Sequence, residues 1–280
     1  MLYPIDVEEA RKSNILVTGT NQQGKSRLVM ALSDVLMRQG WQVIVFDNVG
    51  HWKSQSSVRT YFQVSETTMS YVLPRRSIIY DISLLLPSYQ KEFVENVLND
   101  VWRSRVNRNP SQWLLVVFEE FQLYAKNVRG NVSQNILRIM SVGANHKIRC
   151  LGITPDLSLI DCAFIRLTQQ RYHFRLGNEP NAKRRFRAYY GSDWCRVALA
   201  LDVGYLIYYL KEKLKIRGIP LFRTSRLSMP YREPEEKPKK TLWQKIVGTV
   251  SGSSRLELED DLDEEMEEDL GLLGEPDEEW

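Results

Sequence analysis

A phosphate-binding pattern, G-x-x-x-x-G-K-[ST], stands near the N-terminus of this 280-residue chain. Glycines in such a loop let the backbone turn tightly and aim successive N–H groups at phosphate oxygens. Lys25 is placed to reach the β- and γ-phosphates of a nucleoside triphosphate, and Ser26 to bind Mg²⁺. The sequence therefore predicts a site for ATP with Mg²⁺. We expect its binding residues to be Gly19, Thr20, Asn21, Gln22, Gln23, Gly24, Lys25, Ser26 and Arg27.

A pair of carboxylates is the second element that could do chemistry. The apolar run Trp113–Phe118 leads directly into Glu119 and Glu120. A carboxylate at the tip of a strand can hold the water shell of a metal beside Ser26, and the next residue can orient and deprotonate an attacking water. We assign Glu119 to the metal and Glu120, with Lys25, to catalysis. The roles of the two glutamates are interchangeable at this stage, and a merely solvated strand end is the alternative.

These residues need a sheet to position them. The loop follows an apolar strand, Asn14–Thr18, and precedes a helix over Lys25–Gln39 whose apolar residues share one face. Trp113–Phe118 is apolar at nearly every position, which is typical of a strand covered on both faces. We expect the two strands to lie side by side in the sheet, with Lys25 pointing toward the glutamates.

The remaining residues up to 228 alternate between strands and helices. Further strands are predicted at Trp41–Phe46, Ser77–Ile82, Ile148–Thr154 and Arg171–Leu176, and a hairpin at Val203–Ile219. Further helices are predicted at Gln90–Val106, Val132–Val142 and Pro180–Tyr190. This alternation indicates an α/β fold with a mostly parallel, doubly wound sheet. We expect a P-loop ATPase domain over 1–228, a linker with a short basic amphipathic segment over 229–256, and an acidic disordered tail over 257–280.

Charge is segregated along the chain. Residues 257–280 hold 14 of the 35 acidic residues and no Lys or Arg, so residues 1–256 carry a net charge of +17. Such an excess favours a polyanionic partner such as nucleic acid, and a generally basic, soluble surface is the alternative. We find no signal segment or membrane span, and Cys150, Cys162 and Cys195 form no metal or redox pattern. We expect a cytoplasmic protein, in the host cytoplasm or with the virion if it is viral.

Several segments, over roughly residues 10–220, resemble the FtsK–HerA superfamily of DNA-pumping ATPases. They are the phosphate loop; VIVFDNVGHW, similar to the family's apolar strand, Asp and small loop; VVFEEFQLY, similar to its acidic Walker B; and ILRIMSVGANHKIRCLGIT followed by RYHFRLG. The chain is similar especially to compact members carried by archaeal viruses and plasmids, which include genome-packaging motors. The resemblance implies a RecA-like, additional-strand P-loop fold, with a strand inserted between the two motifs and a catalytic glutamate. It also implies a homo-hexameric ring around double-stranded DNA.

Two positions depart from the family pattern. Where the family commonly has Gly-Arg before the fourth strand, with the Arg acting in a neighbour's site, this chain has Gly143 and Ala144. Where that strand commonly ends in Thr-Gln, a γ-phosphate sensor, Thr154 is followed by Pro155. ATP binding is therefore a safer expectation than efficient hydrolysis. The candidates for a replacement finger are Arg171, which we prefer, and its rivals Arg138 and Arg149.

The sequence leaves the cargo open. A basic helix carries Lys183, Arg184, Arg185 and Arg187, and these side chains either contact DNA phosphates without reading sequence or are simply solvated. The acidic tail either competes with DNA, docks a capsid or other protein partner, or aids solubility. Our preferred function is an ATP-driven translocase of double-stranded DNA, such as a viral genome-packaging motor. A Zot-like virion-assembly or secretion ATPase and a non-hydrolysing, nucleotide-gated scaffold are the alternatives.

Overall fold

The structure, a computed structural model, describes a single α/β unit. The described residues are 7–66, 71, 76–108, 110–126, 133–210 and 213–218, all within the compact unit Met1–Tyr231. The linker predicted over 229–256 and the acidic tail predicted over 257–280 lie outside the described residues.

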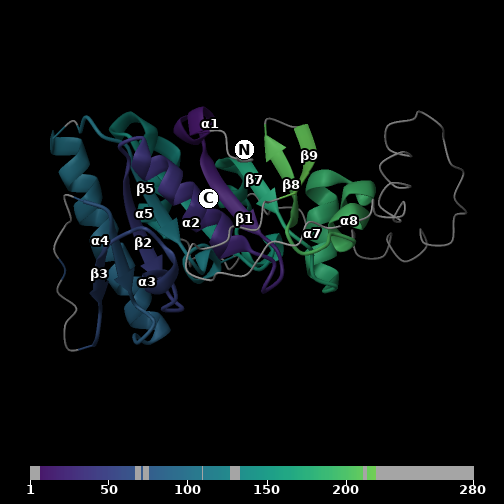
Figure 1. Ribbon diagram of the computed structural model, residues 1–280, viewed down its shortest axis with the longest axis horizontal. Coiled ribbons are helices and arrows are strands. Elements are labelled where there is room, and N and C mark those ends of the chain that lie inside the picture. Colours follow the sequence, from purple (N-terminus) through teal and green to yellow (C-terminus); the bar gives the residue numbers. More distant parts are fainter. Residues whose placement is uncertain are drawn as a thin grey trace, which may run out of the picture. The chain divides into compact units, whose positions relative to one another are not determined.

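Within this part of the chain, one sheet has the strand order β3-β4-β2-β5-β6-β1-β7-β8-β9 (Figure 1). All neighbours from β3 to β7 pair in parallel, and β8 and β9 add an antiparallel hairpin. The strands are β1 (Asn14–Thr18), β2 (Gln42–Asp47), β3 (Thr60–Gln63), β4 (Ile78–Asp81), β5 (Leu114–Phe118), β6 (Ile148–Thr154), β7 (Thr168–His173), β8 (Tyr205–Leu210) and β9 (Lys213–Gly218). The mostly parallel α/β sheet and its C-terminal hairpin are confirmed.

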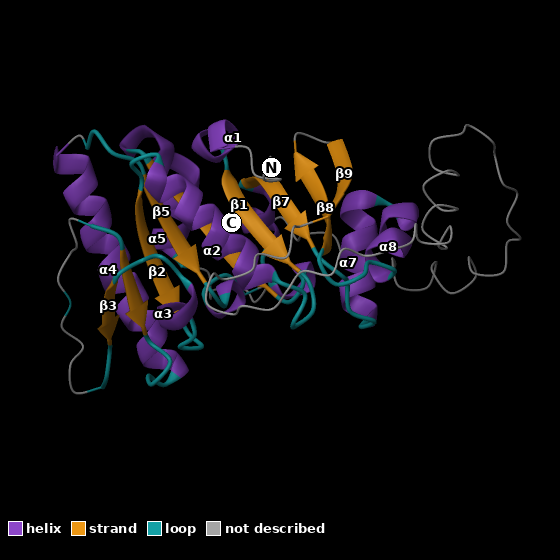
Figure 2. Cartoon of the chain, in the orientation of Figure 1, coloured by secondary structure: helices purple, strands orange, loops and turns teal. Residues whose placement is uncertain are grey.

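Helices connect the parallel strands and flank the sheet (Figure 2). They are α1 (Val7–Lys12), α2 (Lys25–Arg38), α3 (Trp52–Gln55), α4 (Pro87–Arg108), α5 (Gln134–Val142), α6 (Cys162–Arg166), α7 (Pro180–Tyr190) and α8 (Ser192–Leu199). Short 3₁₀ turns are η1 (Phe121–Leu123), η2 (Gly143–His146) and η3 (Leu157–Leu159). Among the described helices, none combines the length and the apolar character that a bilayer crossing requires.

The central strands are buried along their whole length. Every residue of β1, β2 and β5 is buried, as expected of parallel strands that helices cover on both faces. Helix α2 contacts β2, and α5 contacts β6. Aromatic rings fill part of this core, where Phe46 stacks on both Phe118 and Tyr80. The strands that carry the candidate chemistry are therefore fixed by packing along both faces.

The order of the central strands corrects one prediction. Strands β1 and β5 are not neighbours, because β6 lies between them and pairs with both. Strand β6 is thus the additional strand of the expected fold, whereas the prediction that β1 and β5 lie side by side fails. The prediction was wrong because an apolar pattern shows that a strand is buried but not which strand it pairs with. The three strands are parallel, so their carboxyl ends still meet at one edge, where ligands bind in open α/β sheets.

Smaller differences concern single elements. The strand predicted at 171–176 begins earlier, at Thr168, and pairs with β1. The short edge strand β3 and the helices α1, α3, α6 and α8 were not predicted. A four-residue strand with partly exposed side chains gives little periodic signal.

A glycine in β6 lets the chain that follows the carboxylates pack on the sheet. A Cβ at Gly152 would lie 2.5 Å from the ring of Phe121, which is buried against Phe118 and Phe164. Gly152→Ala should therefore displace this ring and lower the free energy of unfolding by about 1–3 kcal/mol, as in other overfilled cores. Denaturant titration measures the loss. Adding Phe121→Leu should restore part of it, and wild-type stability in the single variant would contradict this packing.

Candidate nucleotide-binding site

The phosphate loop joins β1 to α2 in a conformation that glycine permits. Gly19 and Gly24 have φ angles of 139° and 100°, which L side chains rarely adopt. Gly24 caps the N-terminus of α2, and no side chain caps this end of the helix. The first N–H groups of a helix have no partner within the helix. An anion at this end would therefore receive several N–H bonds and the favourable end of the helix dipole.

Backbone contacts hold the loop against the neighbouring strands. The N–H of Gly19 donates to the carbonyl of Pro155 at 3.0 Å, and that of Thr20 to the carbonyl of Arg175 at 2.9 Å. A Cβ on Gly19 would lie 2.5 Å from the Cβ of Phe174, so the loop passes close to the chain that leaves β7. Pro155, at the position expected for a γ-phosphate sensor, thus supports the loop through its carbonyl. Proline offers no side-chain donor for a phosphate.

Lys25 begins α2 with its ammonium folded back over the loop. Its Nζ donates to the carbonyl of Thr20 at 2.8 Å. Burial lowers the pKa of Lys25, and the carboxylates of Glu120 and Glu119 oppose this shift. The ammonium is therefore bonded to its own loop, and the two glutamates act on it through space. A triphosphate bound at the loop would add further negative charge and favour the charged form.

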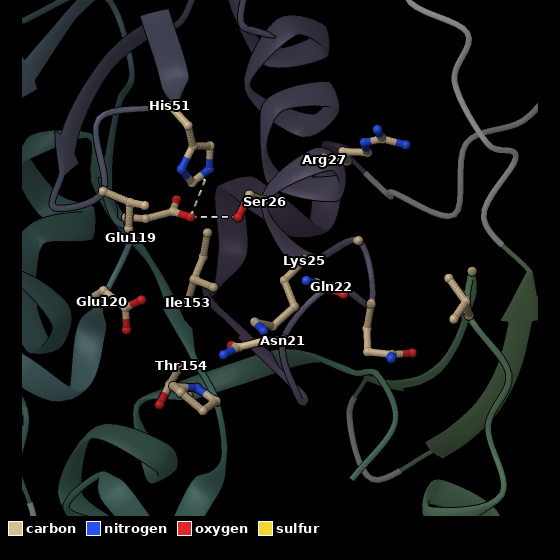
Figure 3. Close-up of a pocket in the computed structure, with 16 residues that line it drawn as sticks. Asn21, Gln22, Lys25, Ser26, Arg27, His51, Glu119, Glu120, Ile153 and Thr154 are labelled. Atoms are coloured by element: carbon tan, nitrogen blue, oxygen red, sulfur yellow. Dashed lines mark hydrogen bonds and ion pairs between the residues drawn. The ribbon is translucent and has the colours of Figure 1, made fainter. Parts of the chain in front are cut away.

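Glu119 is a buried carboxylate in direct contact with the phosphate loop. Its side chain is 4% exposed, and the Nε2 atom of His51 lies 3.4 Å from its Oε1 atom. The same oxygen accepts a hydrogen bond from Ser26 Oγ at 2.5 Å (Figure 3). Burial raises the pKa of Glu119, and hydrogen bonds from Ser26 and Trp52 oppose the shift. The two residues predicted to bind the metal thus meet, although β6 lies between β5, which Glu119 follows, and β1, which the phosphate loop follows.

The contact between Ser26 and Glu119 also fits the chemistry of Mg²⁺. This ion prefers oxygen ligands and keeps several waters, so that one or two protein oxygens and the substrate phosphates usually complete its shell. Ser26 Oγ and Glu119 Oε1 are two such oxygens, held at the start of α2. They therefore form a suitable protein side of a magnesium site.

Glu120 is partly buried and faces the same pocket. Its Oε2 atom accepts a hydrogen bond from Gln122 Nε2, and in Figure 3 its carboxylate stands apart from the bond between Ser26 and Glu119. The two neighbouring glutamates thus have different surroundings. Glu119 is bonded to the loop, and Glu120 lies where a water can approach it.

One cavity of about 660 Å³ brings the predicted residues together. Its volume lies within the range of small-molecule sites. The predicted residues that line it are Asn21, Gln22, Gln23, Gly24, Lys25, Ser26, Arg27, Glu119 and Glu120. Gly19 and Thr20 are not in the lining and instead tie the loop to the sheet. The remaining lining residues are Val49, His51, Ile153, Thr154, Pro155, Val203 and Gly204.

Arg171, the preferred finger candidate, is not brought to this cavity. Its side chain is 6% exposed, and its guanidinium donates to the carbonyls of Thr168 and Ile165 and to the hydroxyl of Tyr190. These bonds join β7 to the end of α7. In this chain Arg171 therefore links β7 to α6 and α7, and its role as a finger in a neighbouring chain stays a prediction.

The two rival arginines also lie away from the cavity. Arg149 is buried and donates twice to the carbonyl of Arg11. Arg138 rests over the ring of Trp102 and bonds to Asn135 on its own helix. Both side chains are therefore engaged within the chain.

Two neighbours of Glu119 were not singled out from the sequence. His51 and Trp52 follow β2, in the segment VIVFDNVGHW, of which only Asp47 drew attention. A polar and an aromatic residue just after the end of a strand are too common to indicate a functional site. Their importance arises only because β2 and β5 are neighbours.

Comparisons with known proteins bear on the fold. No protein-family model and no curated protein matches this sequence. Among solved structures, the genome packaging NTPase B204 of Sulfolobus turreted icosahedral virus 2 with bound sulfate is 16% identical, with a TM-score of 0.60 over 75% of this chain and 98% of that one. The same protein with ATP-gammaS is 14% identical, with a TM-score of 0.57 over 74% and 98%. VirB4 of Thermoanaerobacter pseudethanolicus is 8% identical, with a TM-score of 0.56 over 74% and 89%.

These matches define the class of fold. The chain has a P-loop NTPase fold, with the phosphate loop and the acidic strand end at one edge of the sheet. More narrowly, this is the fold that the chain shares with B204 and VirB4, at TM-scores of 0.60 and 0.56. The resemblance noted in the sequence is thus confirmed at the level of the fold.

Proposed function

We propose that this chain is an ATP-hydrolysing DNA translocase of the FtsK–HerA type, and that it packages a viral genome. The observation that carries the proposal is the bond between Ser26 and Glu119, which unites the phosphate loop and the acidic strand end in one cavity. B204, which has the same fold, is a genome packaging NTPase and binds ATP-gammaS. The match covers 98% of the length of B204 and 74% of this chain.

The residues of the cavity divide the reaction between them. The N–H groups at the start of α2, together with Lys25, bind the phosphate oxygens. Ser26 and Glu119 would hold Mg²⁺, and the ion would supply positive charge that offsets the charge of the phosphates. Glu120 orients a water toward the γ-phosphorus and accepts its proton. Hydrolysis needs no covalent intermediate with the protein, so position and charge supply most of the rate.

We propose double-stranded DNA as the cargo and a homo-hexameric ring as the assembly. Arg184 and Arg187 are exposed on α7, and Lys183 and Arg185 are partly exposed beside them. Such side chains bind phosphates and carry no sequence information, which suits a motor that must pass over any sequence. A ring places identical basic helices around one duplex.

ATP hydrolysis measured with and without double-stranded DNA tests the proposal. We expect magnesium-dependent turnover that DNA stimulates several-fold, on protein whose assembly state is measured by light scattering. Turnover that DNA does not change would support an ATPase with another cargo and contradict the translocase. Nucleotide binding without turnover would contradict both.

The exposed arginines of α7 provide a sharper test of the DNA contact. The double variant Arg184→Ala/Arg187→Ala should lose most of the DNA stimulation and keep the basal turnover. The slope of log K against log salt should also become shallower by about 0.9 for each lost phosphate contact. The control, Arg38→Ala/Arg103→Ala, removes the same charge from exposed sites on α2 and α4. Equal effects of the two double variants would mean that only net charge matters.

A further inference from the structure

The loop that follows β2 is built around the carboxylate of Asp47. Its Oδ1 atom accepts from the N–H groups of Val49 and Gly50 at 3.0 and 2.8 Å, and its Oδ2 atom from the N–H of Trp52 at 2.9 Å. Asp47 and Trp52 are both fully buried, at 0% exposure. The backbone of Trp52 is therefore fixed relative to the end of β2.

The indole of Trp52 reaches across to the next strand. Strand β2 pairs with β5, so the two strand ends lie side by side. The Nε1 atom of Trp52 donates to the Oε2 atom of Glu119 at 2.6 Å. The other oxygen of this carboxylate, Oε1, accepts from Ser26 and lies 3.4 Å from Nε2 of His51. The two oxygens of Glu119 are thus divided, one toward the indole and one toward the phosphate loop.

We propose that Trp52 is a positioning residue whose indole N–H fixes the carboxylate of Glu119, so that its Oε1 atom faces the metal position beside Ser26. This inference rests on the proposed function, because it takes Glu119 and Ser26 as the protein ligands of Mg²⁺. The inference adds a hydrogen bond that links the loop after β2 to that site. Hydrogen bonds that orient a metal ligand typically change metal affinity by about 10–100-fold when they are removed.

Loss of the indole N–H should affect the binding of Mg²⁺ and not the binding of nucleotide alone. Without the indole N–H, the buried carboxylate of Glu119 loses the hydrogen bond to its Oε2 atom and can rotate about its last bond. The phosphate loop is held by other contacts, from Pro155 and Arg175. Binding of nucleotide alone should therefore not depend on Trp52, whereas binding of Mg²⁺ with nucleotide should.

The test is Trp52→Phe, which keeps a buried ring and removes the N–H. In the full chain, affinity for ATP-gammaS is measured by calorimetry over a Mg²⁺ titration and again with EDTA. We expect the Mg²⁺ concentration for half-maximal binding to rise about 10–100-fold, and affinity in EDTA to stay at the wild-type value. Weakening to the same degree with and without Mg²⁺ would show a merely structural role and overturn the inference.

Trp41→Phe is the matched control. Trp41 is also buried, at 3% exposure, and stacks on Trp113. Its Nε1 atom has no acceptor among the described residues, so this variant makes the same change of ring without removing a hydrogen bond. If Trp52→Phe and Trp41→Phe require the same Mg²⁺ concentration for half-maximal binding of ATP-gammaS, the inference fails. If wild-type protein itself binds ATP-gammaS equally with Mg²⁺ and with EDTA, the proposed metal site fails instead.

An isosteric replacement covers the case in which Trp52→Phe does not fold. Benzothienylalanine at Trp52 keeps the bicyclic shape and replaces the N–H by sulfur, which cannot donate. We expect the same rise in the Mg²⁺ requirement as for Trp52→Phe. A wild-type Mg²⁺ requirement in this folded protein would overturn the inference.

Discussion

Glu120→Gln should lower ATP turnover by about 10²–10⁴-fold, which is the usual contribution of a general base, while ATP binding stays nearly unchanged. Glutamine has almost the shape of glutamate and cannot accept the proton of the attacking water. Glu120 lines the cavity and bonds to Gln122, whereas Ser26 bonds to Glu119, so the phosphate loop and the metal position should be undisturbed. Phosphate release measures turnover, and calorimetry with ATP-gammaS measures binding.

Two further variants make this result interpretable. Glu92→Gln removes the same charge from an exposed position on α4 and should leave turnover unchanged. Glu119→Gln should instead raise the Mg²⁺ requirement, because the buried ligand beside Ser26 loses its charge. If Glu120→Gln turned over normally and Glu119→Gln lost turnover at every Mg²⁺ concentration, the two glutamates would have exchanged roles, an alternative that the sequence left open.

Elements with a strong local signal were predicted closely from the sequence. The bounds of β1, β6 and α7 agree with the predicted segments to the residue. Each element has an unbroken apolar or periodic pattern. A residue that ends the helix or strand follows it, such as Gly191 after α7. The phosphate loop was predicted for the same reason, since its glycines and Lys25 are contiguous in the chain.

Features that depend on which strands are neighbours were not predicted. The pattern of β6 gave its bounds but not its place between β1 and β5. The bond from Trp52 to Glu119 joins residues 67 positions apart and exists because β2 pairs with β5. The burial of Arg171 was not predicted either. An arginine beside a strand has the same sequence signal whether it is exposed or buried under α7.

Lys25→Ala should weaken ATP binding by about 100-fold or more and abolish measurable turnover. Removing one partner of a desolvated charge pair costs about 2–5 kcal/mol, and about 2.8 kcal/mol corresponds to 100-fold. The loss has two sources. The phosphates lose an ammonium, and Glu119 and Glu120 lose the nearby cation that offsets their charge. Calorimetry with ATP-gammaS measures the affinity.

Two control variants, Lys25→Arg and Arg103→Ala, distinguish the effect of the positive charge of residue 25 from the effect of its exact position. Arg103→Ala removes an exposed charge on α4 and should leave affinity unchanged. Lys25→Arg keeps the charge, but its larger planar guanidinium cannot repeat the bond of Nζ to the carbonyl of Thr20 without moving the loop. It should therefore retain part of the affinity and little of the turnover. If Lys25→Ala bound ATP-gammaS as tightly as the wild type, the cavity would not be the triphosphate site, and the roles assigned to Ser26, Glu119 and Glu120 would lose their common basis.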